Sequence, residues 1–264
     1  MVLVNLDPAN ENIPYDCDLD VRELIELDTV MEESSLGPNG ALLYCMESLE
    51  INFDWLKERI ESFDPESYFV FDFPGQVELF TNHESVYNLI HSLERELYFR
   101  LVAVHLADST HCKDPLRFIS LAMLTLQSMV KLEFPQINVM SKFDKFSAND
   151  LSGGGEDEFP LPLSFYADCQ DISLLLDNVK IPPKLSSLTQ AIAEMIDDFG
   201  MVSFIPLAVE DKECMAYFMQ EADKANGLVF GALTAGNESI LQTAMTTTNR
   251  EEYLESMERK YMKL

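Results

Sequence analysis

The sequence predicts an α/β fold in which helices cover both faces of a doubly wound, mostly parallel sheet. Two features of the chain predict this fold. Short apolar runs with strand composition alternate with amphipathic helical patterns, as they do in proteins with parallel sheets. In addition, aspartates recur at the ends of those runs, and the carboxyl ends of parallel strands form the edge where ligands bind.

Five apolar runs are expected to form the strands. Each run is short and dominated by Val, Ile, Leu or aromatic residues, and the first begins at Met1 itself. The strands are predicted at residues 1–6, 68–72, 101–108, 136–141 and 201–207. The polar residues expected at the ligand edge are Asp7, Asp72, Asp108, Asp144 and Ser203.

Amphipathic patterns predict the helices. The final helix, over residues 249–264, is charged, and Glu255 and Arg259 have the spacing of an i,i+4 ion pair. Its apolar stripe of Tyr253, Met257 and Tyr261 is expected to pack against the chain's own domain. The earlier helices are predicted at residues 21–31, 42–61, 82–98, 114–132 and 184–198.

The length of 264 residues fits one domain that spans residues 1–264. Residues 147–165 interrupt the alternation with three consecutive glycines, several acids and two prolines, which predicts a surface loop. We expect this loop and the helices that follow it to form an insertion over residues 147–200.

Charge and cysteine content narrow the class of protein. Acidic residues outnumber basic ones by 46 to 18, a formal net charge of −28, which disfavours phosphate backbones and anionic membranes as partners. The five cysteines are scattered and form no Cys-x-x-Cys pair, as in a reducing compartment. No apolar run approaches the length of a membrane span. We therefore expect a cytoplasmic protein with no membrane segment and no direct contact with nucleic acid.

The run from Tyr68 to Gln76 carries the first chemical signal. Strand-forming residues lead to Asp72, and Pro74 and Gly75 then end the strand. An acid at the carboxyl end of a parallel strand typically holds Mg²⁺, directly or through water, beside nucleotide phosphates. Gly75 has no Cβ, so its backbone N–H can approach the last phosphate closely. The alternative is an ordinary strand and turn with a capping aspartate.

The residues Ser141-Lys142-Phe143-Asp144 follow the fourth predicted strand and have the pattern that recognises guanine. The Asp144 carboxylate would accept the N1–H and N2–H₂ protons of guanine together, and adenine offers no such pair of donors. The Lys142 stem would lie along the purine while its ammonium ties neighbouring loops together. Ser203, in the fifth predicted strand, is a weaker candidate for contact with the base. The alternatives are a solvated turn at residues 141–144 and a simple buried strand around Ser203.

The segment Gly37-Pro38-Asn39-Gly40 is, on its own, a turn signal. Its position after a helical pattern and before Asp72-Phe73-Pro74-Gly75 removes this ambiguity. Together with residues 5–11 and 141–144, in this order and spacing, it makes the chain resemble the GPN-loop GTPases over almost its whole length. Within that family, Asn10 and the segments 103–109 and 223–227 resemble one eukaryotic paralogue.

The resemblance implies a three-layer fold of the P-loop NTPase type, hydrolysis of GTP, and GTP and Mg²⁺ as cofactors. It implies that Asp7 lies near Mg²⁺ and the attacking water, and that Asp72 is the acid associated with Mg²⁺. Gly75 would sense the γ-phosphate, and Gln76 would position the water.

The resemblance also implies partners. Family members are dimers in which the loop of Gly37, Pro38 and Asn39 reaches into the partner's nucleotide site, so Asn39 would act in trans. The expected partner is another GPN-loop GTPase paralogue, in a homodimer or heterodimer. Because family members help to assemble RNA polymerases II and III and bring them into the nucleus, polymerase subunits and shuttling to the nucleus are also expected.

The chain departs from the family at its start. GPN-loop GTPases open with a strand and a Gly-x-x-Gly-x-Gly-Lys-[Ser/Thr] phosphate loop before the strand that contains Asn5, and this sequence has no such loop. The three glycines at 153–155 lack the following Lys and the preceding strand. The fold is therefore expected to be truncated at its N-terminus. Two explanations stay open, an incomplete gene model of a GTPase and a catalytically dead dimerisation module.

Expressed from Met1, the chain is expected to bind neither GTP nor GDP at high micromolar nucleotide and to aggregate. The missing loop would supply about five charge-assisted hydrogen bonds of about 1.5 kcal/mol or more each. Their sum approaches the binding energy of a micromolar site, about 8.2 kcal/mol. The missing strand would leave sheet edges exposed. Fluorescent-nucleotide titration and light scattering measure both effects, and tight Mg²⁺-dependent binding would show that another segment cradles the phosphates.

Overall fold

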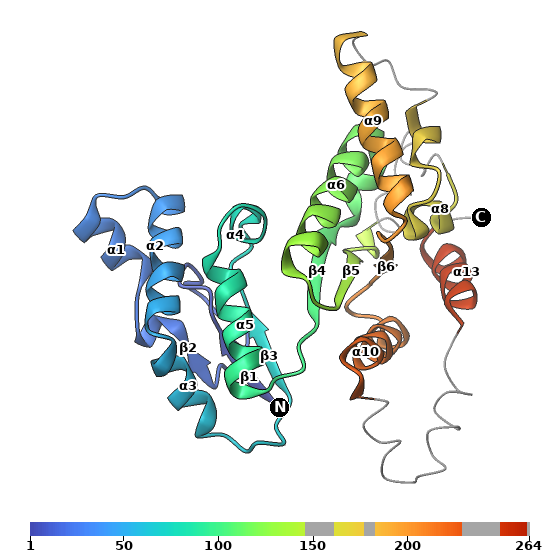
Figure 1. Ribbon diagram of the computed structural model, residues 1–264. Coiled ribbons are helices and arrows are strands. Elements are labelled where there is room, and N and C mark those ends of the chain that lie inside the picture. Colours follow the sequence, from blue (N-terminus) through green and yellow to red (C-terminus); the bar gives the residue numbers. More distant parts are fainter. Residues whose placement is uncertain (146–160, 177–182, 229–248, 263–264) are drawn as a thin grey trace, which may run out of the picture. The chain divides into compact units, whose positions relative to one another are not determined.

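A computed structural model describes residues 1–145, 161–176, 183–228 and 249–262 of the chain. These residues fall into two compact units, Met1–Phe99 and Arg100–Leu264, each with its own parallel sheet (Figure 1). It remains a prediction that residues 1–264 form one domain. No helix in the described ranges is both long and apolar enough to cross a membrane.

The first unit is built on a three-stranded parallel sheet in which β1 (Val2–Asn5) is central. β2 (Leu19–Asp20) pairs with one edge of β1, and β3 (Phe69–Asp72) pairs with the other. In this register Asn5 lies opposite Asp20 on one side and Asp72 on the other. Because the strands are parallel, their carboxyl ends all lie at the same edge of the sheet.

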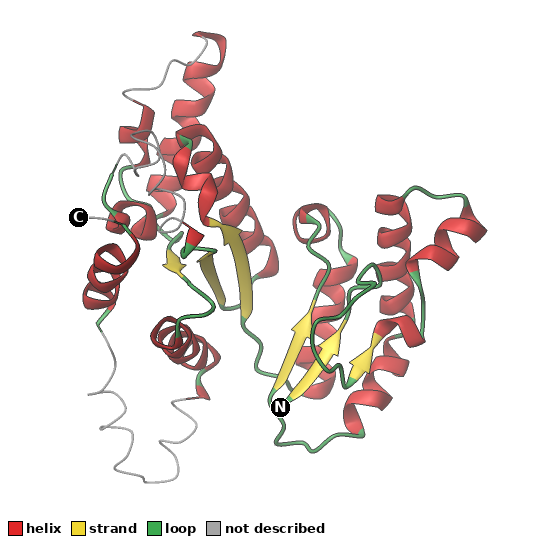
Figure 2. Ribbon diagram, turned by 180° about the vertical axis from the view of Figure 1, so that it is seen from behind, coloured by secondary structure: helices red, strands yellow, loops and turns green. Residues whose placement is uncertain are grey.

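Helices cover one face of this first sheet. Figures 1 and 2 view the unit from opposite sides, and both place α2, α3 and α5 on the same face. The side chains of Val4, Leu6, Leu49 and Leu56 are fully buried in this unit. Its helices are η1 (Val21–Glu23), α1 (Leu27–Ser34), α2 (Pro38–Ile51), α3 (Phe53–Glu61), α4 (Val77–Thr81) and α5 (Ser85–Leu97).

Two helical predictions in the first unit are wrong in detail. The pattern over residues 42–61 forms two helices because Asn52 ends α2, and its side-chain Nδ2 donates to the Ser48 carbonyl over 2.7 Å. Asparagine competes in this way with the helical backbone. The pattern over residues 21–31 likewise divides into η1 and α1, and the two-residue strand β2 before it was not predicted.

The second unit has the strand order β4–β5–β6, again all parallel. Its strands are β4 (Ala103–Asp108), β5 (Gln136–Ser141) and β6 (Phe204–Pro206). The Asp114 carboxylate caps α6 by accepting from the backbone amides of Leu116 and Arg117. The helices of this unit are η2 (Ser109–Lys113), α6 (Pro115–Leu132), α8 (Leu163–Asp168), η3 (Ile172–Leu176), α9 (Pro183–Phe199), α10 (Lys212–Asn226) and α13 (Arg250–Tyr261).

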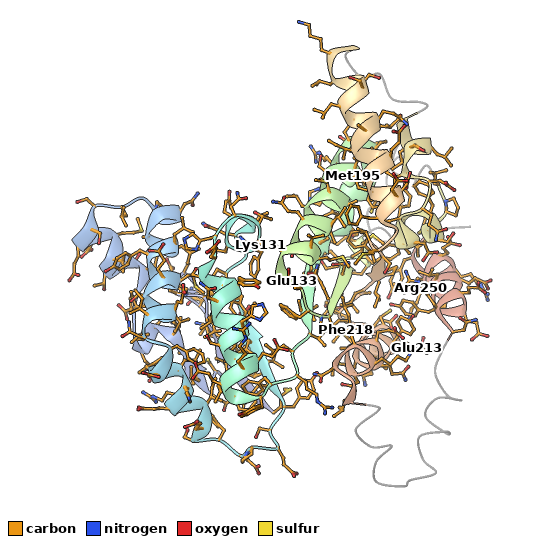
Figure 3. All side chains as sticks on the ribbon, in the orientation of Figure 1. Lys131, Glu133, Met195, Glu213, Phe218 and Arg250 are labelled. Carbon is orange, nitrogen blue, oxygen red and sulfur yellow. The ribbon has the colours of Figure 1, made fainter. Side chains whose placement is uncertain are left out.

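The last helix packs against its own unit, as its pattern predicts. Tyr253 and Met257 of the apolar stripe are buried, and the Tyr253 ring stacks on Tyr217 with centroids 3.8 Å apart. Arg250, labelled in Figure 3 at the start of α13, donates to the Asp168 carboxylate and to two backbone carbonyls. The predicted ion pair between Arg259 and Glu255 is also present, at 2.8 Å.

The predicted α/β architecture with parallel strands is confirmed. In the described part of the chain, no strand hydrogen-bonds to the free edges of β3 and β4, so the strands form two sheets. Most of the predicted loop 147–165, including glycines 153–155, lies outside the described residues. Its last part is helical rather than looped, because α8 begins at Leu163.

Candidate nucleotide site

Two carboxylates meet at the carboxyl edge of the first sheet. Asp72 is the last residue of β3, and Asp7 lies two residues beyond β1. Burial raises the pKa of Asp7, the amide of Ala9 counteracts this through a hydrogen bond of 2.9 Å, and the negative charge of Asp72 raises the pKa further. Two like charges that perturb each other in a partly buried position are stabilised by a bound cation.

The two carboxylates fit Mg²⁺ better than a metal that needs a complete protein cage. Mg²⁺ usually binds one or two carboxylates and completes its shell with water and substrate phosphates. Across the described ranges, no group of three or more His, Cys, Asp or Glu residues could hold a metal. Asp7 and Asp72 therefore suit an ion that arrives together with a nucleotide.

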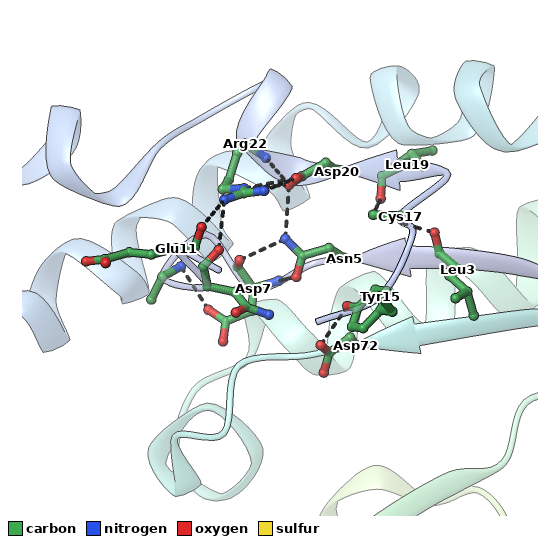
Figure 4. A network of polar contacts seen from close by, with 12 residues as sticks. Leu3, Asn5, Asp7, Glu11, Tyr15, Cys17, Leu19, Asp20, Arg22 and Asp72 are labelled. Carbon is green, nitrogen blue, oxygen red and sulfur yellow. Dashed lines mark hydrogen bonds and ion pairs between the residues drawn. The ribbon is translucent and has the colours of Figure 1, made fainter. Parts of the chain in front are cut away.

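Asn5 fixes the backbone at Asp7 (Figure 4). Its side chain is fully buried at the end of β1. The Asn5 Oδ1 accepts from the Asp7 amide over 3.2 Å, and Nδ2 donates to the Asp7 carbonyl over 3.1 Å. The same Nδ2 donates to Asp20 Oδ1 over 3.0 Å. This buried amide therefore links the two strand ends and sets the start of the loop that carries Asp7.

Arg22 holds the next part of that loop. Its guanidinium binds the Asp20 carboxylate through Nε and Nη2, and its Nη1 donates to the carbonyls of Asn10 and Glu11 over 2.8 and 3.2 Å. Burial opposes ionisation of Asp20, but the hydrogen bonds from Arg22 outweigh it and lower the pKa of this carboxyl. The ion pair is therefore well placed to fix the backbone after Asp7 (Figure 4).

The glycine that follows β3 is exposed, and the glutamine after it is half-buried. A Cβ added at Gly75 would meet no atom within 4 Å, so crowding within the chain does not explain the glycine. The side chain of Gln76 donates from Nε2 to Asn39 Oδ1 over 3.0 Å. The structure thus brings Gln76 and Asn39 together within the first unit.

The segment Gly37-Pro38-Asn39-Gly40 begins a helix and is not an isolated turn. Gly37 is the N-cap of α2, and Pro38 occupies the first helical turn, where its missing N–H needs no partner. Neither Gly37 nor Asn39 is buried. Asn39 therefore lies on the surface at the helix start.

The second unit carries the predicted guanine-recognition residues at the end of β5. Ser141 is the last residue of the strand, and its hydroxyl donates to the Ala107 carbonyl over 2.9 Å. Lys142 has a left-handed backbone with φ of 59°, and its ammonium lies 2.8 Å from Asp108 Oδ2. This contact joins the ends of β4 and β5, as predicted for the lysine. Asp144 is exposed beyond them.

The buried side chain of Phe143 anchors the segment 141–144. Phe143 is fully buried, its amide donates to the Leu207 carbonyl over 3.2 Å, and its ring forms a T-shaped pair with the Tyr261 ring. Of the four residues in this segment, Phe143 is therefore the one that packs inward, whereas Lys142 and Asp144 face solvent.

Ser203 is not where the sequence predicts it. β6 begins at Phe204, so Ser203 precedes the strand at its amino end, opposite to the end that leads toward Leu207. Its carbonyl accepts from Asn138 Nδ2 over 3.1 Å. The error arises because the apolar run suggests a strand from residue 201, whereas only three residues pair with β5. Ser203 therefore lies away from the carboxyl edge.

Sequence patterns alone missed Asn5, Tyr15, Asp20 and Arg22 as residues around the carboxylates. Tyr15 donates its hydroxyl proton to Asp72 Oδ2 over 2.7 Å (Figure 4). One available signal was charge, because Arg22 is the only Lys or Arg among the first 56 residues of a strongly acidic chain.

Known proteins resemble this chain over most of its length. Residues 1–228 match a family described as "Conserved hypothetical ATP binding protein". The GPN-loop GTPase 2 of Danio rerio is 43% identical over 92% of this chain and 76% of its own length. The GPN-loop GTPase 2 homolog of Dictyostelium discoideum is 42% identical over 98% and 81%. The GPN-loop GTPase QQT1 of Arabidopsis thaliana is 39% identical over 99% and 87%.

The fold also matches a solved structure. A GTPase from Pyrococcus abyssi, crystallised in its apo form, aligns with a TM-score of 0.63 over 85% of each chain. At 23% identity this match supports the fold. The relatives named GPN-loop GTPase 2 agree with the paralogue resemblance that Asn10 and the segments 103–109 and 223–227 indicate.

Replacing Lys142 by Met should change how acid affects the second unit. Burial opposes ionisation of Asp108, but hydrogen bonds from Lys142 and Thr110 lower its pKa to about 2. A carboxyl group whose pKa falls on folding stabilises the fold above its unfolded pKa, about 3.9, and this contribution disappears as the pH falls toward 2. Wild type should therefore exceed Lys142→Met in urea stability at about pH 5, and the two should converge between about pH 4 and pH 2.

Lys145→Met provides the control, because it removes an exposed ammonium three residues away. The difference in urea stability between Lys145→Met and wild type should be independent of pH over the same range. If the difference in urea stability between wild type and Lys142→Met did not change with pH, this would contradict a stabilising contact between Lys142 and Asp108.

Proposed function

Because the chain belongs to the GPN-loop GTPase family, we propose that it binds GTP with Mg²⁺ and hydrolyses it. The observation that carries this proposal is the pair of carboxylates, Asp7 and Asp72, at the carboxyl ends of neighbouring parallel strands. That edge is where sheets of this class bind nucleotide phosphates. In the proposed reaction, Asp72 holds Mg²⁺, directly or through water, and Asp7 orients the attacking water.

Gly75 and Gln76 complete the set of residues around the γ-phosphate in this proposal. The Gly75 amide donates to the phosphate, which its open surroundings permit. Gln76, whose half-buried side chain donates to Asn39, positions the water. Bound Mg²⁺ would neutralise phosphate charge during the transfer.

Guanine is the proposed base, although the matching family is described as ATP binding. Asp144 is exposed three residues beyond the end of β5, and a carboxylate can accept two guanine protons together. Lys142 forms an ion pair with Asp108, which fixes its ammonium at the ends of β4 and β5. Ser141 stays in the proposed site through its position next to Lys142, whereas Ser203 is withdrawn from it.

The proposed assembly is a dimer with another GPN-loop GTPase, homo- or heterodimeric, in which Asn39 acts at the partner's site. The surface position of Asn39 at the start of α2 supports this role. We further propose a cytoplasmic assembly factor that shuttles to the nucleus and acts on RNA polymerase II and III subunits. A net charge of −28 favours partners with basic surfaces.

Base recognition gives the first test. Since a phosphate loop is not among these 264 residues, binding is measured on the intact protein as its own cells make it, with the 264-residue chain alongside. Asp144→Asn should lose GTP affinity by ~2–4 kcal/mol, because two charge-assisted hydrogen bonds are lost together. It should gain affinity for xanthosine triphosphate, whose C2 carbonyl accepts from the new amide. Unchanged guanine preference would refute the assignment of residues 141–144.

The Gly-Pro-Asn loop gives the second test. Asn39→Ala should leave GTP affinity nearly unchanged and lower kcat by ~10²-fold or more, as removal of one positioned polar group from a transition state does. Single-turnover hydrolysis measures the effect. Mixing Asn39→Ala with Asp72→Ala subunits tests action in trans, because only one of the two mixed sites then has both residues. If kcat of Asn39→Ala fell by less than a few fold, the loop would have a structural role and no role in hydrolysis.

A further inference from the structure

The loop after β1 contacts both carboxylates of the candidate site. It carries Asp7 near its start, and eight residues later it carries Tyr15, whose hydroxyl reaches Asp72 Oδ2 over 2.7 Å (Figure 4). The hydroxyl donates, because an ionised carboxylate only accepts hydrogen bonds. One loop therefore supplies one carboxylate and holds the other.

The loop is fixed to the sheet on both sides of Tyr15. Before it, the Arg22 guanidinium binds the Asn10 carbonyl over 2.8 Å. After it, Asp18 exchanges two hydrogen bonds with the backbone of Leu3 in β1, at 2.8 and 2.9 Å. Because both flanks are anchored, little further entropy is lost when the Tyr15 hydroxyl meets Asp72.

A hydrogen bond to one oxygen of a carboxylate has a directional effect. It restricts rotation of the Asp72 group and leaves Oδ1 as the oxygen available to a metal ion or its water. Side chains that orient metal-binding carboxylates in this way change metal affinity by about 10- to 100-fold when they are removed.

We propose that Tyr15 is a positioning residue, whose hydroxyl orients the Asp72 carboxylate toward Mg²⁺ in the nucleotide complex. This inference rests on the proposed function of the same site. It assigns a task to a residue that touches neither the nucleotide nor the metal in the scheme, and it makes the ordering of the Asp7 loop and the binding of Mg²⁺ interdependent.

A loop tether alone would have different consequences. If the Tyr15 bond merely held the loop to β3, its loss would lower the stability of the fold and leave the response to Mg²⁺ unchanged. If Tyr15 orients Asp72, its loss should weaken Mg²⁺ binding specifically. Nucleotide affinity measured without metal distinguishes the two, because it does not depend on the orientation of Asp72.

The experiment compares Tyr15→Phe with wild type and with Tyr44→Phe in the intact protein. Tyr15→Phe removes one hydroxyl and keeps the ring, and Tyr44 is an exposed tyrosine on α2 in the same unit. Fluorescent GTP is titrated first in EDTA, and the complex is then titrated with Mg²⁺. Tyr15→Phe should raise the Mg²⁺ concentration at the midpoint of the titration by about tenfold. Its affinity for fluorescent GTP in EDTA and its unfolding midpoint should equal the control values. Tyr44→Phe should match wild type throughout.

An Asp72→Asn background provides the internal check. There, Tyr15→Phe should cause no further shift, since the group that Tyr15 orients has lost its charge. A wild-type Mg²⁺ midpoint in Tyr15→Phe would overturn the inference and leave the proposed function intact. Wild-type protein that binds no guanine nucleotide, or binds it without response to Mg²⁺, would overturn the proposed function and the inference with it.

Discussion

The buried amide of Asn5 is the constraint on which the first unit depends. It lies at the end of the central strand, opposite Asp20 on one side and Asp72 on the other. A fully buried amide that lacked partners would cost about 1–3 kcal/mol, so its hydrogen bonds to Asp7 and Asp20 are effectively obligatory. Asp20 in turn binds Arg22, and Arg22 donates to the backbone beyond Asp7. The position of Asp7 thus follows from satisfying the hydrogen bonds of one buried side chain.

The second unit uses an ion pair for a similar purpose. Lys142 and Asp108 join the ends of β4 and β5, and the buried ring of Phe143 fixes the loop between them and Asp144. Exposed ion pairs alone contribute little to stability. Here the pair acts together with the buried ring to fix the backbone between β5 and Asp144. The side chain of Asp144 itself is exposed.

Much of this arrangement could be predicted from the sequence, because parallel strands have a strong apolar signal. The strand over residues 136–141 was predicted with its observed bounds, and Asp72 and Asp108 were placed at strand ends. Ser203 was misplaced because an apolar run does not show where pairing begins. The contacts of Asn5 and Tyr15 were not predictable for a different reason. Apart from the bonds between Asn5 and Asp7, these contacts join residues distant in the chain, such as Tyr15 and Asp72, and no local pattern records which loop crosses which strand end.

The distribution of the few cations explains why a metal suits this edge. In the part of the chain that the structure describes, Arg22 pairs with Asp20 and Lys142 pairs with Asp108, and no Lys or Arg forms an ion pair with Asp7 or Asp72. Within the first unit, Arg22 therefore stabilises a residue beside the carboxylates, and no described Lys or Arg pairs with the carboxylates themselves. In a chain with a net charge of −28, phosphate would be repelled from such an edge. A divalent ion that arrives with the nucleotide removes this repulsion, because it binds the carboxylates and the phosphates at once. The acidity of the chain and the absence, within the described residues, of a Lys or Arg paired with Asp7 or Asp72 thus both favour the proposed binding of a divalent cation with the nucleotide.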